Sequence, residues 1–442
     1  MKKIMVETPK GLRLHIGLFG KRNAGKSSLI NALTNQNISI VSDVAGTTTD
    51  PVEKACELAP IGPVVLIDTA GIDDIGPLGL ARVERTKNVL QWVDIAIIVG
   101  NAQNFDRYEE DLIKEALQLG TPTILALNKS SLYPIDSVFL NRIRSFGLPF
   151  VQTDAQDRIG IEDLRQAIIS IAADHIPEDR LLVGDLVGAG DTVILVTPID
   201  TGAPKGGLIL PQVQAIRELL DAHAKCFVVQ QDKVSECLNE LRKPPKLVIA
   251  DSQVIMDVAN QTPESIPLTT FSIQMAYSKS DVISMAEGTA ALASLQDGDR
   301  VLICETCSHH PQKDDIGRVK IPRWLKQKTG KNLIIEIAVG KDFPVDLSPY
   351  KVLIQCGGCV VTRRHMLSRL RAARAQNVPM TNYGLTISYL QGVIERVLLC
   401  HPDALVAYKK ALERATNEFS ISKISKKKVG LHKLINLDNT YL

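Results

Sequence analysis

The sequence lacks any apolar run long enough to cross a membrane. The longest runs, such as residues 93–99 with Asp94 inside, fall far short of the about 20 apolar residues that a spanning helix needs. The opening residues MKKIMVETPK also lack the apolar segment of a secretion signal. We therefore expect a cytoplasmic protein with no membrane partner.

The chain also lacks a net charge of either sign. Its 442 residues include 51 Lys and Arg against 49 Asp and Glu, a formal net charge of +2, and only 4% are aromatic. Proteins that bind nucleic acids commonly carry a basic patch, and many add aromatic side chains on which bases stack. A nucleic acid is therefore not expected as the main partner, and the lysines at 426–428 are weak grounds for one.

Cysteine is scarce and unevenly placed. Eight cysteines in a chain of this length do not make the dense pattern of a disulfide scaffold. Four of them cluster between positions 304 and 359, namely Cys304, Cys307, Cys356 and Cys359. In a reducing compartment such clustering indicates metal ligation before disulfide bonding.

The apolar pattern predicts an α/β protein made of three segments and a tail. In residues 1–176, short apolar runs alternate with helical patterns, which predicts a mostly parallel sheet with ligands at the carboxyl ends of its strands. The strand-like runs of this segment are 14–19, 64–67, 95–99, 123–127 and 149–152.

Two smaller α/β segments follow. Residues 177–270 contain strand-like runs at 192–196 and 246–250, and packing or subunit association is the expected role of this segment. Residues 271–402 hold the cysteine motifs, at the ends of the runs 301–303 and 352–354. Residues 403–442 are expected to form a basic helical tail.

A nucleotide motif follows the first apolar run. Residues 20–27 match the pattern G-x-x-x-x-G-K-S and lead into a helical pattern, which is the context of a phosphate-binding loop. In such a loop the backbone amides surround the phosphates, Lys26 contacts the β- and γ-phosphates, and Ser27 binds Mg²⁺. The predicted nucleotide contacts here are Gly20, Asn23, Ala24, Gly25, Lys26, Ser27 and Ser28.

Two further loops complete the predicted phosphate and metal contacts. Thr47 and Thr48 lie in the first long loop, where Thr48 would coordinate Mg²⁺ and sense the γ-phosphate. Asp68 follows an apolar run and is placed toward Mg²⁺, with Gly71 free to bring its amide to the γ-phosphate. The expected catalytic residues are therefore Lys26, Thr48 and Asp68.

The base end of the site departs from the usual pattern. Asn128 and Lys129 follow the run 123–127, where the amide can read the base edge and the lysine stem can cover its face. This order of motifs resembles translation-factor-class GTPases, which usually carry, in place of Ser131, an aspartate that accepts two N–H groups of guanine. Because a hydrogen bond to a charged group contributes about 1.5–3 kcal/mol, Ser131 is expected to weaken the preference for GTP by about one to two orders of magnitude.

Within that class, Asn23 and the Gly-Thr-Thr loop are similar to the potassium-activated TrmE/Era-type GTPases of tRNA modification and ribosome assembly. That resemblance implies that Asn23 helps to hold K⁺ beside the phosphates. Ile72 stands where other GTPases have a water-orienting glutamine. Slow, potassium-stimulated hydrolysis is therefore expected.

The cysteine cluster allows two kinds of metal site. Cys307, Cys356 and Cys359 can hold three corners of a cubane iron–sulfur cluster and leave the fourth iron open to an exchangeable ligand. With His309 as a fourth ligand, the same cysteines would instead form a closed zinc site. Cys304 lies inside an apolar run and is expected to be buried.

The cysteine motifs also carry a specific resemblance. Cys-x-His at 307–309, followed by Cys-x-x-Cys at 356–359, resembles the signature of the HydF family, the GTPases that mature FeFe-hydrogenase. The resemblance extends over residues 10–400 and includes the segments 314–318, 321–324 and 382–384.

Membership of this family would have several consequences. It implies a GTP-binding domain, a dimerisation domain and a domain that holds a 4Fe-4S cluster through the three cysteines. It also implies a homodimeric scaffold that receives the diiron precursor of the hydrogenase active site from radical-SAM maturases. The FeFe-hydrogenase apoprotein would be the final partner.

One cluster position departs from the family pattern. The second histidine of the family is Gln355 here, and glutamine is a poor iron ligand. The fourth iron would then take His309, Glu305, water or an incoming ligand, and in the family an acidic residue at the place of Glu305 can approach the cluster. An RNA-modification or ribosome-assembly GTPase with a structural zinc site stays open as the alternative function.

Overall fold

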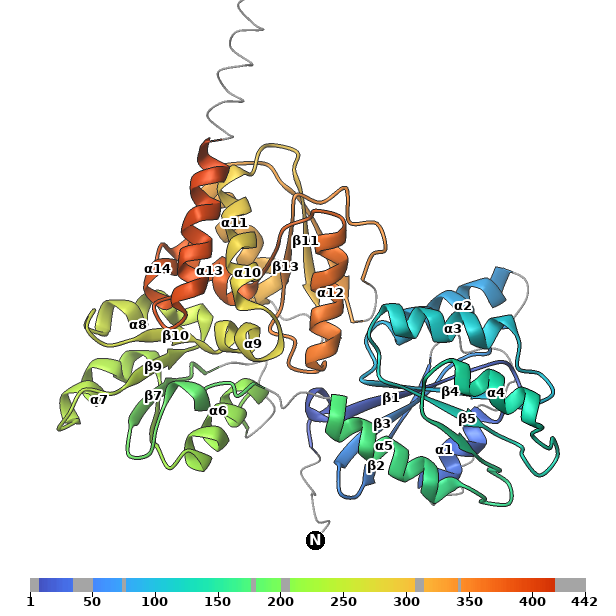
Figure 1. Ribbon diagram of the computed structural model, residues 1–442. Coiled ribbons are helices and arrows are strands. Elements are labelled where there is room, and N and C mark those ends of the chain that lie inside the picture. Colours follow the sequence, from blue (N-terminus) through green and yellow to red (C-terminus); the bar gives the residue numbers. More distant parts are fainter. Residues whose placement is uncertain are drawn as a thin grey trace, which may run out of the picture. The chain divides into compact units, whose positions relative to one another are not determined.

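The computed structural model describes residues 8–34, 51–73, 77–175, 180–199, 207–306, 314–340 and 343–417. The chain divides into two compact units, residues 1–178 with 364–368, and residues 179–363 with 369–442. Figure 1 shows the helices and strands of both units. Over the described ranges, no helix is both long and apolar enough to pass through a membrane.

The first unit is built on a six-stranded sheet whose strands lie in the order β2-β3-β1-β4-β5-β6. β2 pairs antiparallel with β3, and the other pairings are parallel, so the predicted α/β fold with a mostly parallel sheet is confirmed. The strands are β1 (Leu14–Phe19), β2 (Val52–Leu58), β3 (Gly62–Asp68), β4 (Ile95–Gly100), β5 (Thr123–Leu127) and β6 (Phe150–Gln152).

Helices cover both faces of this sheet. Helices α1 (Lys26–Thr34) and α5 (Ile161–His175) pack on one face, while α2 (Pro77–Leu90), α3 (Arg107–Gln118) and α4 (Ser137–Ser145) pack on the other (Figure 1). Successive side chains of β4 alternate between the two cores, and all six of its residues are buried. A strand covered on both faces is continuously apolar, which is why its sequence does not alternate with polar residues.

The second unit contains two four-stranded parallel sheets. The first has the order β10-β9-β7-β8, and its strands are β7 (Thr192–Val196), β8 (Lys225–Val229), β9 (Leu247–Ala250) and β10 (Leu268–Thr270). Its connecting helices are α6 (Leu210–Asp221), α7 (Val234–Glu240) and α8 (Ile255–Gln261), and α9 (Phe271–Lys279) follows β10.

The second sheet of this unit has the order β12-β11-β13-β14. Its strands are β11 (Arg300–Glu305), β12 (Ile334–Val339), β13 (Val352–Gln355) and β14 (Met380–Asn382). Around it lie α10 (Val282–Thr289), α11 (Ile321–Thr329), α12 (Arg363–Ala375) and α13 (Tyr383–Gln391). Helix α14 (Ile394–Val397) contacts α13 and β10, and residues 402–417 form a further helix.

The predicted site residues gather at the carboxyl ends of parallel strands. In the first unit the phosphate-binding loop follows β1, Asp68 ends β3, and Asn128 follows β5. In the second unit Glu305 ends β11 and Cys356 follows β13. Loops at this edge of a parallel sheet are the usual place for ligands, because consecutive strands deliver their ends side by side.

Candidate functional site

The phosphate-binding loop turns tightly between β1 and α1. Gly20 has a φ of +146°, and a Cβ there would lie 2.2 Å from the carbonyl oxygen of Val99. Gly25 has a φ of +96°, and its Cβ would lie 2.1 Å from Nδ2 of Asn128. Only glycine fits both positions, so the loop can pass close to the ends of β4 and β5.

Lys26 lies folded over this loop. Its side chain is 7% exposed, and Nζ donates to the carbonyl oxygens of Gly20 at 2.9 Å and Lys21 at 2.8 Å. The ammonium group is thus held over the loop by two backbone carbonyl oxygens, at the start of α1. This is the arrangement that binds phosphate oxygens at a helix N-terminus.

The two predicted Mg²⁺ contacts of the described residues meet directly. The hydroxyl of Ser27 donates to the carboxylate of Asp68 across the loop. Burial raises the pKa of Asp68, and the Ser27 hydrogen bond and the charge of Lys26 act in the opposite direction. A hydroxyl and a carboxylate in contact are oxygen ligands of the kind that Mg²⁺ prefers.

An open cavity of about 540 Å³ lies over these residues. Its walls come from the loop, from the end of β3 and from Lys129 after β5. Eight predicted nucleotide contacts line it: Asn23, Gly25, Lys26, Ser27, Ser28, Asp68, Gly71 and Lys129. Thr47 and Thr48, predicted for the same site, lie outside the described residues.

Asn128 joins three loops at the base end of this site. Its Nδ2 donates to the carbonyl oxygen of Ala24 at 3.0 Å. Its Oδ1 accepts from Oγ1 of Thr153 at 3.2 Å and from the amide of Ala155 at 3.1 Å. Thr153 and Ala155 did not enter the sequence prediction, although their place directly after β6, at the same sheet edge, was a usable signal.

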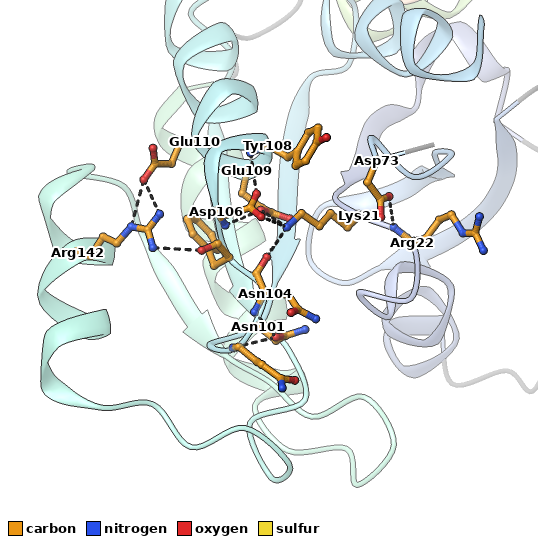
Figure 2. A network of polar contacts seen from close by, with 12 residues as sticks. Lys21, Arg22, Asp73, Asn101, Asn104, Asp106, Tyr108, Glu109, Glu110 and Arg142 are labelled. Atoms are coloured by element: carbon orange, nitrogen blue, oxygen red, sulfur yellow. Dashed lines mark hydrogen bonds and ion pairs between the residues drawn. The ribbon is translucent and has the colours of Figure 1, made fainter. Parts of the chain in front are cut away.

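A second cavity, of about 440 Å³, lies beside the phosphate-binding loop. Figure 2 shows the polar network there, in which Nζ of Lys21 contacts the carboxylates of Asp106 at 2.7 Å and Glu109 at 3.6 Å. Asp106 and Glu109 also form the capping box at the start of α3. Lys21 therefore fixes one side of the loop to the N-terminus of α3.

The loop after β3 also contacts the phosphate-binding loop. The amide of Arg22 donates to Oδ1 of Asp73 at 2.7 Å, as Figure 2 shows. A Cβ on Gly71 would lie 2.7 Å from the same amide nitrogen, so the two loops meet without space for a larger side chain. Glycine at this position lets the loop after Asp68 approach the phosphate-binding loop at the wall of the cavity.

Cys356 lies at the carboxyl end of β13, in the second unit. Its sulfur is 3.2 Å from the amide nitrogen of Thr306, 3.3 Å from Oγ1 of Thr306 and 3.4 Å from Nε2 of Gln355. Hydrogen bonds to a ligating sulfur are one of the features that tune iron–sulfur sites. The surroundings of Cys356 therefore fit a cluster ligand.

Cys359 is held in the loop that follows. Burial raises the pKa of its thiol, and Cys356 raises it further, while the charge of Lys279 opposes both effects. Lys279 ends α9 and is 4% exposed, and its Nζ lies 3.3 Å from the carbonyl oxygen of Cys359 and 2.8 Å from that of Val361. A buried ammonium group thus binds the backbone of the cysteine loop.

Gln355 connects Cys356 to a buried arginine. Arg369 of α12 is 3% exposed, and its Nη1 donates to Oε1 of Gln355 at 3.1 Å. Because arginine only donates hydrogen bonds, this contact turns the oxygen of Gln355 toward Arg369 and its NH₂ group toward Cys356. Nε2 of Gln355 also donates to the carbonyl oxygen of Cys304 at 3.1 Å.

Cys304 and Glu305, the last two residues of β11, have different surroundings. Cys304 is fully buried, and burial raises the pKa of its thiol to about 12. Glu305 is 2% exposed, and its carboxylate accepts from Nη2 of Arg318 at 2.9 Å. As a metal ligand, Glu305 would therefore share its carboxylate with Arg318.

The third predicted cluster cysteine is not described. Cys307 and His309 both lie outside the described ranges, between Thr306 and residue 314. Across the residues that the structure does describe, no three His, Cys, Asp or Glu side chains are grouped closely enough to hold a metal ion. The sequence motif, and not the geometry, is what assigns Cys307 to the same site.

Three family models match the chain. The model for the hydrogen maturase F dimerization domain matches residues 182–280, and that for the hydrogen maturase F tetramerization domain matches residues 283–400. The model described as 50S ribosome-binding GTPase matches residues 15–129. Together they match strands of all three sheets, although β6 of the first sheet lies outside the matches.

The curated relatives resemble the GTPase part. The tRNA modification GTPase MnmE of Synechococcus sp. (strain JA-3-3Ab) is 34% identical over 190 residues, which cover 41% of this chain and 40% of that protein. MnmE of Bacillus subtilis (strain 168) is 36% identical over 165 residues, which cover 35% of this chain and 33% of that protein. The chain thus matches no more than about two fifths of the length of these relatives.

Solved structures match weakly over the same region. Era of Aquifex aeolicus bound to GDP·AlF₄⁻ is 19% identical, with a TM-score of 0.33, covering 49% of this chain and 93% of that one. The FeoB G-domain of Methanococcus jannaschii is 24% identical, with a TM-score of 0.29, covering 37% of this chain and 99% of that one.

The two domain models that follow the GTPase domain are both specific to hydrogen maturase F. They match the segments in which the sequence predicted association and metal binding. With the GTPase match before them, they confirm the resemblance drawn from the cysteine motifs. The chain belongs to the hydrogen maturase F (HydF) family and carries a GTPase domain.

Proposed function

We propose that this chain is a slow, potassium-stimulated GTPase that binds a 4Fe-4S cluster and assembles or delivers the diiron precursor of the FeFe-hydrogenase active site. It works as a cytoplasmic homodimer, receives the precursor from radical-SAM maturases and passes it to the hydrogenase apoprotein. The observation that carries the metal part is the sulfur of Cys356, which lies within 3.4 Å of three possible donors.

The GTPase part follows from the phosphate-binding loop and its contacts. Lys26 binds the β- and γ-phosphates, and Ser27 and Asp68 hold Mg²⁺ together with Thr48. Bound by these residues, Mg²⁺ would supply positive charge that offsets the negative charge developing on the phosphate oxygens. Gly71 brings a backbone amide to the γ-phosphate, while Asn128 reads the base and Lys129 covers it.

Potassium dependence is proposed for Asn23. Its φ of +58° is left-handed, and its exposed side chain lines the nucleotide cavity. GTP hydrolysis measured in equal concentrations of potassium and sodium chloride should be faster in potassium, and Asn23→Ala should remove the difference. Equal rates in both salts for the wild-type chain would overturn this role.

The cluster part assigns Cys307, Cys356 and Cys359 as ligands, with His309 or Glu305 as candidates for the fourth iron. Two features of the described residues support it. Hydrogen-bond donors lie around the sulfur of Cys356, and Lys279 brings a positive charge to the cysteine loop. A 4Fe-4S cluster with three thiolate ligands would supply a fourth iron at which the precursor docks.

Anaerobic reconstitution tests this part. The purified chain should take up about four iron and four sulfide per chain and show the electron paramagnetic resonance signal of a reduced cubane cluster. Cys356→Ser and Cys359→Ser should lose this signal and the bound iron. Cys237→Ser, which changes a cysteine on helix α7 beside the first sheet of the unit, should keep both. Stoichiometric zinc without iron would replace the proposal with the closed zinc site.

A further inference from the structure

The base end of the nucleotide site needs a carboxylate that Ser131 cannot provide. The base-pairing edge of guanine presents two donors, N1–H and the 2-amino group, and a carboxylate accepts both with charge-assisted hydrogen bonds. Asn128 marks where the base binds, because it joins the phosphate-binding loop to the loop after β6. A guanine-selecting acid should therefore lie next to Asn128 and Ser131.

Asp154 occupies that place. It follows β6, and its Oδ2 accepts the amide of Ser131 at 3.3 Å. Its two chain neighbours, Thr153 and Ala155, both hydrogen-bond to Oδ1 of Asn128. The side chain of Asp154 is thus fixed between the residue that reads the base edge and the serine that stands in the usual acid's position.

The surroundings of Asp154 keep it ionised. Its Oδ1 accepts from the amides of Gln156 at 3.0 Å and Asp157 at 3.3 Å. Burial favours the neutral acid, but the hydrogen bonds from Asp157, Ser131 and Gln156 outweigh it and hold the pKa below its ordinary value. Oδ2 accepts the amide of Ser131, and a carboxylate oxygen can accept a further hydrogen bond from a ligand.

We propose that Asp154, in the loop after β6, is the guanine-selecting carboxylate of this chain. It would do the task of the aspartate that other GTPases usually carry in place of Ser131. In this arrangement the carboxylate comes from the loop after β6 and lies across a hydrogen bond from Ser131. The inference deepens the nucleotide part of the proposed function and rests on it. It also reverses the expectation that Ser131 weakens the preference for guanine.

Base analogues separate this role from simple loop capping. Calorimetric titrations would compare guanosine, inosine and xanthosine diphosphates, because inosine lacks the 2-amino donor and xanthine carries an oxygen there. The wild-type chain should bind the guanosine form about tenfold or more tightly than the inosine form, which is the value of one charge-assisted hydrogen bond.

Asp154→Asn should weaken binding of the guanosine form by about tenfold or more and shift preference toward the xanthosine form, because the new NH₂ group donates to the added oxygen. Asp157→Asn, an exposed Asp-to-Asn change in the same loop, is the matched control and should keep the wild-type preference. A residue that merely caps its loop would not change the order of these ligands.

Two results would overturn the proposal. One is equal affinity of the wild-type chain for the guanosine and inosine forms, a measurement that does not depend on the folding of a variant. The other is a guanosine-to-xanthosine ratio in Asp154→Asn that matches that of Asp157→Asn. Failure of the wild-type chain to bind any of the three nucleotides would instead refute the nucleotide part of the proposed function.

Discussion

His401 is a buried imidazole whose surroundings favour the neutral form. It is 7% exposed, its ring centroid lies 4.8 Å from that of Tyr277, and its Nε2 is 3.1 Å from Nε2 of Gln274. Burial lowers its pKa from 6.5 to about 4. Between these two values the unfolded chain binds a proton that the folded chain does not, so stability falls as the pH falls.

We therefore expect the second unit to lose about 3 kcal/mol of unfolding free energy from His401 between pH 6.5 and pH 4. Urea unfolding followed at several pH values measures this loss. His401→Phe keeps a ring against Tyr277 and should flatten the dependence over that window. His223→Asn, which removes a histidine at a left-handed position of the same unit, is the control. An unchanged slope in His401→Phe would contradict the prediction.

Single residues also show which contacts the sequence can predict and which it cannot. The motif spacing was sufficient to bring Lys26, Ser27 and Asp68 into one site, because the loop leading to Lys26 follows β1 and Asp68 ends the neighbouring parallel strand β3. It did not reveal the contact of Asp154 with Ser131, which depends on how two loops meet at the sheet edge. Contacts made by side chains far apart in the chain leave no periodic signal.

At the level of elements, the strands buried on both faces were the predictable ones. The runs expected at 14–19, 95–99 and 123–127 are β1, β4 and β5, with ends that agree to within one residue. β2 was not predicted, since it lies at the sheet edge, pairs antiparallel and carries Glu53, Lys54 and Glu57. An edge strand needs few apolar residues and resembles a loop in sequence.

Helix α12 places a positive charge behind the cysteine site. Nη2 of Arg369 donates to the carbonyl oxygen of Gly340 at 2.6 Å, and its guanidinium lies 5.0 Å from the ring centroid of Phe343. No carboxylate within the described ranges pairs with it. Since a buried cation without an anion is costly, a cluster bound at Cys356, which Arg369 reaches through Gln355, would supply the compensating negative charge.

The chain of contacts from Arg369 through Gln355 to Cys356, here called the relay, predicts an effect on the reduction potential of the proposed cluster. Gln355→Leu removes a donor from the sulfur and Arg369→Gln removes a charge, so both should shift the midpoint potential to more negative values. The combined change should be less than the sum, because the two residues act through one contact. Potentiometric titration followed by electron paramagnetic resonance measures the shift.

The control for this relay is Arg371→Gln, an exposed arginine on the same helix. It removes an equal charge without the contact to Gln355 and should leave the midpoint unchanged at the same iron content. Full iron content with unshifted potentials in both Gln355→Leu and Arg369→Gln would rule the relay out.

At the scale of the whole molecule, the exposed edge of the first sheet in the second unit points to self-association. β8 is the outer strand, and Phe227 and Val228 on it are 42% and 44% exposed. This strand lies within the match to the hydrogen maturase F dimerization domain. An apolar edge strand with unpaired backbone groups favours pairing with a second copy.

Phe227→Asp should therefore weaken the dimer. Loss of a buried aromatic contact of about 1.5–3 kcal/mol corresponds to a tenfold to hundredfold rise in the dissociation constant, before the cost of burying the new charge is added. Light scattering after size-exclusion chromatography at micromolar concentration should then record a larger monomer fraction. Val138→Asp, at a 78% exposed position on α4 of the GTPase unit, should leave the mass unchanged. If Phe227→Asp keeps the wild-type mass down to the lowest measurable concentration, β8 is not the strand through which two copies associate. The exposed side chains of β12, including Ile334, are then the next surface to change.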